Sequence, residues 1–180
     1  AVEESRLLSG VICGEQRLER WTTSGKPAPP DYYAARGRLT EVMQALKLDV
    51  SDRRLTDDSR LHPGRAATLV LEGRPLGCFG QLHPELAASH NLPEATFLFE
   101  LDLTRLVESA TRRNRWVPAF KAFPTVPASE RDLAVVVDRS QAASDLMQSI
   151  RKAGKPLLEA VTLIDRFEGD QLGENKASQA

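Results

Sequence analysis

The spacing of apolar residues predicts a strand and then a helix near the start of the chain. Residues 7–13 form a short apolar run bounded by glycine, which is typical of a buried strand. Behind Asp31, apolar residues recur at helical spacing and predict an amphipathic helix through about residue 47, with Asp31 as its N-cap. Gly37 lies inside this helix, where glycine is unfavourable, and predicts a close approach of the helix to a neighbouring backbone.

Shorter apolar runs follow the predicted helix. Gly73 separates two of them and predicts a hairpin, because glycine readily forms the turn. His83-Pro84 opens a short helix with proline at its first position, and Asp102 offers an N-cap to another helix. The predicted elements are strands at 68–72, 76–80 and 97–101, a short helix that ends at Asn91, and a short helix through Val107.

A basic, proline-rich connector begins near residue 112 and is expected to be extended and stiff. Beyond it the pattern predicts a strand at 133–137, a helix capped by Ser140 and ended by Gly154 and Pro156, and a strand at 157–164. These elements indicate an α+β protein. Its predicted parts are a domain at 1–112, a linker at 113–122 and a second domain at 123–180.

Composition and charge narrow the classes of function. Hydrophobic residues make up 41% and charged residues 27% of the 180 residues, which is typical of a soluble globular protein. The formal net charge of −1 provides no global attraction to nucleic acid or to an anionic membrane, so RNA binding requires a local basic surface. No apolar run approaches the length of a membrane span. Cys13 and Cys78 are predicted to be reduced thiols in the core of a cytoplasmic protein.

The histidines and paired carboxylates are the candidates for catalysis and metal binding. His62 and His83 each precede a proline, and a turn in which the imidazole caps a backbone group explains both. None of the GxSxG, HExxH, P-loop or GxGxxG motifs is present to supply a catalytic partner. A solvated turn accounts for Asp57-Asp58, and a helix cap accounts for Asp102 beside Glu100. We therefore assign no catalytic residue and no metal ligand.

Basic residues in and beyond the connector are the candidates for nucleic-acid binding, because lysine and arginine supply the phosphate contacts. Trp116, Phe120 and Phe123 lie among them and could stack on unpaired bases. The alternative is a solvated linker whose aromatic side chains pack on one domain or the other. The candidates are Arg112, Arg113, Arg115, Lys121, Arg131, Arg151, Lys152 and Lys155.

Several stretches, taken in order and spacing, resemble the β chain of bacterial phenylalanyl-tRNA synthetase. The first stretch is an aromatic-rich helix start at 30–37. The second is Leu61-His62-Pro63-Gly64-Arg65-Ala66-Ala67, which is followed by Gly73, Gly77, Gly80 and Leu82-His83-Pro84. The remaining ones are Phe99-Glu100-Leu101-Asp102-Leu103, Phe123-Pro124-Thr125-Val126 with Arg131-Asp132-Leu133-Ala134, Leu158-Glu159-Ala160-Val161, and Phe167-Glu168-Gly169.

The resemblance implies a fold for each part of the chain. Residues up to about 112 resemble the second half of a class-II-synthetase-like antiparallel sheet domain, a non-catalytic copy that packs against the catalytic subunit. Residues from about 120 resemble the first half of a ferredoxin-fold anticodon-binding domain, in which a further helix and two strands are missing. We expect such a half-domain to expose an edge strand and a helix face.

The resemblance also implies a function. The family charges phenylalanine tRNA with phenylalanine, using ATP and Mg²⁺, as a cytoplasmic or plastid heterotetramer of two α and two β subunits. This segment would support subunit assembly and tRNA binding, would carry no catalytic residue, and would itself bind no cofactor. The rival interpretations are a stand-alone RNA-binding or protein-interaction module and a small hydrolase that uses His62 or His83.

Overall fold

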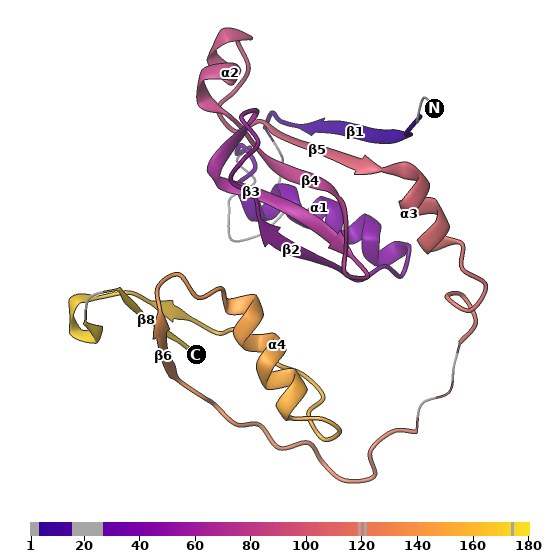
Figure 1. The fold of residues 1–180 in the computed structure, drawn as a ribbon, viewed down its shortest axis with the longest axis vertical. Helices are drawn as coiled ribbons and strands as arrows, with labels where there is room; N and C mark the ends of the chain where they lie inside the picture. The colour runs from indigo at the N-terminus through magenta and orange to yellow at the C-terminus, as the bar shows by residue number, and fades with distance from the viewer. Residues whose placement is uncertain (1–3, 16–26, 119, 121, 174) are drawn as a thin grey trace. The chain divides into compact units, whose positions relative to one another are not determined.

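The computed structural model describes residues 4–15, 27–118, 120, 122–173 and 175–180, which form two compact units, Ala1–Phe120 and Lys121–Ala180 (Figure 1). The first unit contains β1 (Leu7–Ile12), α1 (Tyr32–Ala45), β2 (Val50–Arg54), β3 (Leu61–Leu71), β4 (Arg74–Leu82), α2 (Pro84–Ser89), β5 (Phe97–Asp102) and α3 (Leu103–Ala110). The second contains β6 (Val135–Asp138), α4 (Ala143–Ala153), β7 (Arg166–Phe167), the 3-10 helix η2 (Asp170–Leu172) and β8 (Lys176–Gln179). The predicted α+β class is confirmed.

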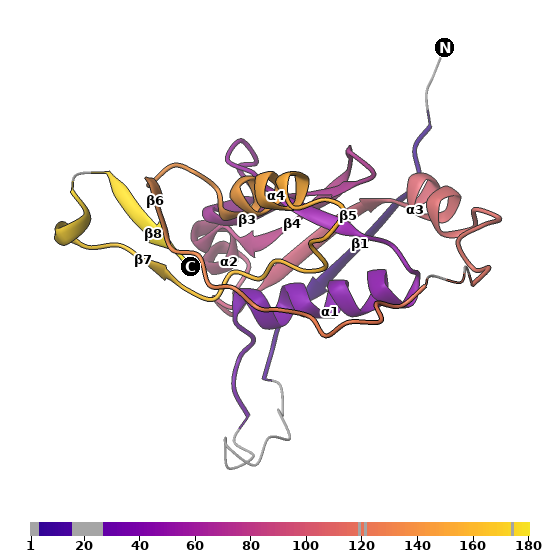
Figure 2. The ribbon, with the colours of Figure 1, turned by 90° about the horizontal axis from the view of Figure 1, so that it is seen from below.

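A five-stranded antiparallel sheet in the order β1-β5-β4-β3-β2 forms the first unit. Helix α1 lies along one face of this sheet (Figure 2) and buries Ala35, Leu39 and Met43 in the core. Phe79 is at the centre: its ring stacks on that of Phe97, with centroids 6.0 Å apart. The core therefore depends on apolar side chains from strands that are distant in sequence.

The predicted caps of α1 and α3 are confirmed. The Asp31 carboxylate accepts a hydrogen bond from the Ala34 N–H at 2.6 Å, and the Asp102 carboxylate accepts one from the Arg105 N–H at 2.9 Å. The expected close approach at Gly37 is wrong, because no atom lies within 4 Å of the position that a Cβ there would take. Gly37 is thus a glycine without a packing role in this structure.

The hairpin around Gly73 is confirmed, although its strands are longer than predicted. Glu72 and Gly73 have φ angles of 52° and 78°, the left-handed pair that suits a tight hairpin turn. Strand β2 was not predicted, since its sequence, VSDRR, is polar. It becomes a strand by pairing along β3, and the Arg36 guanidinium of α1 binds Asp52 on β2 at 2.6 Å.

The prediction of a buried first strand with a core thiol after it is wrong. Strand β1 is confirmed as a strand, but it forms the edge of the sheet, and Leu7 and Val11 are more than half exposed. Cys13 is exposed and Cys78 is half-buried. An apolar run predicts a strand but cannot show whether another element covers it.

A three-stranded antiparallel sheet in the order β6-β8-β7 forms the second unit, with α4 beside it. The predicted strand near 133–137 and the helix end at Gly154 are confirmed. The Ser140 cap is wrong, because α4 begins after Ala142, which makes no side-chain cap. The strand predicted at 157–164 is also wrong: this segment is an extended strap, and the strands are β7 and β8.

The apolar residues of 158–164 line a cavity together with residues of α4, whereas Leu157 is exposed. The cavity holds about 180 Å³. In the described parts of the chain, no helix combines the length and apolar character required to cross a membrane.

Candidate nucleic-acid-binding surface and polar sites

The histidines form no catalytic arrangement in the described residues. Nδ1 of His62 accepts a hydrogen bond from the Gly64 N–H at 3.0 Å, which confirms its predicted capping role. His83 precedes α2 without a side-chain cap, so the same prediction is wrong for His83. Among residues whose placement is described, no cluster of three or more histidine, cysteine, aspartate and glutamate side chains could hold a metal ion.

One arginine binds a carboxylate from each of the two acidic pairs noted in the sequence, Asp57-Asp58 and Glu100/Asp102. Arg60 binds Asp58 through two hydrogen bonds, at 3.0 and 2.7 Å, and lies 3.4 Å from Glu100. The hydrogen bond from Arg60 lowers the pKa of Asp58, so this group stays a carboxylate rather than serving as an acid. Burial raises the pKa of the neighbouring Cys78 thiol, which makes it a poor nucleophile.

Two of the predicted nucleic-acid-binding arginines already have protein partners. Arg112 lies 2.7 Å from the Glu72 carboxylate, and Arg115 lies 2.8 Å from the same carboxylate. The Trp116 indole N–H donates to the Ala110 carbonyl at 2.7 Å, and the Lys47 ammonium lies 4.9 Å from the centre of the indole ring. The start of the connector is therefore held against the first unit.

The remaining candidates are more exposed. The side chains of Arg113, Lys152 and Lys155 are exposed, and they make no hydrogen bond or ion pair to another described residue. The Arg151 side chain donates only a long hydrogen bond, 3.4 Å, to the Val161 carbonyl. The last turn of α4 and the residues just beyond it therefore carry a basic cluster, defined as Arg151, Lys152 and Lys155.

Two more candidates complete the set. The exposed Arg131 donates to the Glu130 carbonyl at 2.7 Å. Lys121 lies outside the described residues.

The face of the second sheet that points away from α4 carries an exposed aromatic ring that was not singled out in the sequence. Val136, Ser178 and Phe167 are neighbours across the sheet, and they alternate with the buried Ala177 and Gln179. Phe167 is 51% exposed, and an exposed ring on a sheet can stack on an unpaired base. Only the strand register reveals this face, because the strand that carries Phe167 was predicted in the wrong place.

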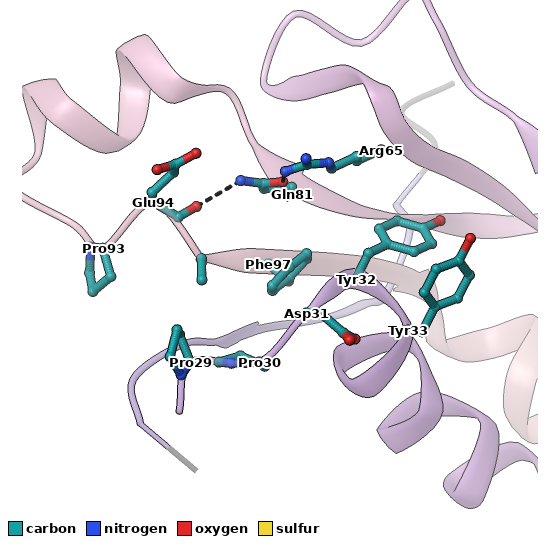
Figure 3. Close-up of a pocket in the computed structure, with 11 residues that line it drawn as sticks. Pro29, Pro30, Asp31, Tyr32, Tyr33, Arg65, Gln81, Pro93, Glu94 and Phe97 are labelled. Atoms are coloured by element: carbon teal, nitrogen blue, oxygen red, sulfur yellow. Dashed lines mark hydrogen bonds between the residues drawn. The ribbon is translucent and has the colours of Figure 1, made fainter. Parts of the chain in front are cut away.

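A cavity of about 570 Å³ lies at the first turn of α1 (Figure 3). Tyr32, Tyr33 and Phe97 give it an aromatic lining, with prolines alongside. At its polar side, the Arg65 guanidinium donates to Gln81 Oε1 at 2.7 Å, and Gln81 Nε2 donates to the Glu94 carbonyl at 2.9 Å. This shape suits a flat or apolar group, and the described residues of its lining include no serine, cysteine or histidine that could act as a nucleophile or base.

Comparison with known proteins assigns both units to known domains. Residues 1–103 match the phenylalanyl tRNA synthetase beta chain CLM domain, and residues 124–180 match the ferredoxin-fold anticodon binding domain. Between these ranges lies the connector, with its predicted arginines.

Similar full-length proteins carry one name. The chain is 99% identical over 180 residues to the phenylalanine–tRNA ligase beta subunit of Parasynechococcus marenigrum strain WH8102. The subunits of the same name from Synechococcus sp. strain CC9605 and Prochlorococcus marinus strain MIT 9313 are 72% and 58% identical over 180 and 179 residues. The matches cover 100% of this chain in the first two cases and 99% in the third, but only 22% of each relative. The chain belongs to the phenylalanyl-tRNA synthetase β-chain family and contains its CLM and ferredoxin-fold anticodon-binding domains.

Proposed function

We propose that this chain is a segment of the β subunit of an enzyme that joins phenylalanine to its tRNA with ATP, and that it supplies tRNA binding and subunit contacts. The observation that carries the proposal is the match of residues 124–180 to an anticodon-binding domain. The whole enzyme would use ATP and Mg²⁺, and it would assemble from two α and two β subunits in a bacterial cytoplasm or a plastid.

Within the second unit, the tRNA contacts would come from two separate features, one on α4 and one on the sheet face that points away from α4. The basic cluster of Arg151, Lys152 and Lys155 would bind phosphates, since such contacts need exposed cations and little shape. Phe167 would stack on an unpaired base. Arg113 and Arg131 are exposed and remain candidates for further phosphate contacts.

We further propose that the second unit represents the first four of the six elements of the ferredoxin fold, which is one strand more than the first half expected from the sequence. That fold has the element order β-α-β-β-α-β, and the unit shows β6, α4, β7 and β8. Two observations support the proposal. Strand β6 has one neighbour in its sheet, and the buried Gln179 Oε1 lacks a hydrogen-bond partner among the described residues. A further strand and helix would pair with β6 and cover this region. We likewise propose that the first unit represents the second half of the class-II-like domain, because its sheet is antiparallel and a helix packs on it.

The test is binding of phenylalanine tRNA to the complete synthetase, measured at several salt concentrations. The test variant replaces Arg151, Lys152 and Lys155 with glutamine, and the control replaces the exposed Arg38 on α1. For the test variant we expect weaker binding, and a salt slope that flattens by about 0.7–0.9 per lost phosphate contact. Phe167→Ala should weaken binding without changing the slope. Unchanged binding by both variants would contradict this assignment of the tRNA surface.

A further inference from the structure

The guanidinium of Arg115 joins three elements that are distant in sequence. Its Nε donates to the Ser109 carbonyl at 2.7 Å, in the last turn of α3. One terminal nitrogen donates to the Lys47 carbonyl at 2.6 Å, just beyond the end of α1. The other lies 2.8 Å from the Glu72 carboxylate, in the turn between β3 and β4. The Arg115 side chain is only 18% exposed.

Two of these contacts satisfy backbone carbonyl groups, and the third pairs the guanidinium with a carboxylate. The last carbonyls of a helix have no partner within the helix, and the negative end of the helix dipole favours a cation there. Arg115 supplies both to the last turn of α3, and it also donates to the carbonyl of Lys47, one residue past the C-cap of α1, while Glu72 balances its charge. Lys47 and Glu72 have left-handed backbone conformations, with φ of 55° and 52°, so Arg115 bridges two positions where the chain reverses sharply.

Trp116 strengthens the same arrangement. Its indole N–H caps the carbonyl of Ala110, the last residue of α3, and Lys47 covers the ring. The chain from α3 to Trp116 therefore folds back on the first unit instead of leaving it at Thr111. In Figure 1 the connector leaves α3 and passes through this loop before it extends.

We propose that Glu72, Arg115 and Trp116 form a clasp that fixes residues 110–116 to the first unit and sets the point from which the chain continues to the tRNA-binding unit. Arg115 is then a positioning residue, and Arg112 supports it through Glu72. Both act on tRNA indirectly, rather than by touching phosphate. The consequence for tRNA rests on the function proposed above, whereas the clasp itself does not.

The chemistry of arginine separates a clasp from a phosphate contact. A guanidinium has donors in a fixed planar fork and can reach three acceptors at once, whereas an ammonium is a compact point charge. Arg115→Lys should thus break the clasp, although it would preserve most of a phosphate contact. Glu72→Gln distinguishes the clasp from a phosphate contact in the opposite way. It weakens the clasp, but it removes the carboxylate that pairs with Arg112 and Arg115 and so would make both arginines more available to tRNA phosphates.

The experiment uses the complete synthetase with Arg115→Lys or Glu72→Gln. Arg53→Lys and Glu108→Gln are matched controls, since both native side chains are exposed and make no ion pair in the described part of the chain. Hydrogen exchange is followed at the amides of Thr111 and Arg115, which bond to the Val107 and Arg112 carbonyls. We expect about tenfold faster exchange in both clasp variants and no change in the controls. Equal exchange in all variants would overturn the clasp, whatever the enzyme does with tRNA.

Aminoacylation kinetics test the positioning role. Both clasp variants should raise the KM for tRNA about threefold to tenfold and leave ATP–pyrophosphate exchange with phenylalanine unchanged, because that step needs no tRNA. Tighter tRNA binding by Glu72→Gln, together with normal behaviour of Arg115→Lys, would show direct phosphate contacts and refute the positioning role. An unchanged KM beside faster exchange would also refute it. Failure of the native enzyme to bind tRNA would count against the proposed function but not against the clasp.

Discussion

The stability of the first unit should depend strongly on Phe79. This side chain is fully buried, and its ring packs against those of Tyr32, 5.3 Å away, and Phe97, 6.0 Å away, which also contact each other at 6.3 Å. These neighbours come from α1 and β5, while Phe79 belongs to β4. Truncation to alanine removes the buried ring and its contacts. It leaves a cavity that α1, β4 and β5 would have to move together to close.

We expect Phe79→Ala to lower the free energy of unfolding by about 3–5 kcal/mol, the range observed for buried phenylalanines. For a unit of this size, such a loss corresponds to a melting temperature lower by about 10–20 °C. Phe79→Leu keeps much of the volume and should cost about 1–2 kcal/mol. The control is Phe120→Ala, because Phe120 is exposed and its loss should change the stability by less than about 0.5 kcal/mol.

Tryptophan fluorescence during urea unfolding provides the measurement. The chain has two tryptophans, Trp21 and Trp116. In a Trp21→Phe background the signal comes from Trp116, which contacts the first unit. The midpoint should move to lower urea in Phe79→Ala, with an unchanged slope. A loss below about 1 kcal/mol in Phe79→Ala would refute the reasoning, since it would mean that the aromatic stack does not hold α1 on the sheet.

Three further outcomes follow from the caps, charges and thiols. Asp102→Ala removes the N-cap of α3 and should cost about 1 kcal/mol in the same urea titration, while Asp102→Asn should retain most of the stability. Arg60 lowers the pKa of Asp58. The stabilising effect of this carboxylate is therefore present above its unfolded-state pKa and is lost as the pH falls through its folded-state pKa. In Asp58→Asn, the free energy of unfolding should depend less on pH in the acid range. Cys13 is exposed and the pKa of Cys78 is raised by burial, so Ellman's reagent should modify Cys13 first, and equal rates at both thiols would contradict this.

Local signals identified most of the helices. Asp31 and Asp102 cap helices because a carboxylate can reach backbone N–H groups only a few residues away. Gly73 forms its turn for a similarly local reason. Gly154 ends α4, and its N–H bonds to the carbonyl of Ile150 in the last turn of that helix. Each of these features depends on neighbouring residues, so the sequence alone determined them.

Tertiary structure decided the strands and the partners of the charged residues. The polar strand β2 exists because β3 pairs with it, and the apolar residues of 158–164 line a cavity instead of forming a strand. The exposure of Phe167 depends on the register of β7 against β8. Strand state and side-chain direction depend on which segments meet, and that choice is made by contacts between distant residues.

The connector shows the same division most clearly. Its arginines and prolines are visible in the sequence, and they predicted a basic linker for nucleic acid. What the sequence did not show is that Glu72, from a hairpin about forty residues earlier, binds Arg112 and Arg115. The sequence by itself determined where positive charge is placed along the chain. The fold determined which of those charges are already satisfied, because ion pairs form between residues that folding alone brings within a few ångströms.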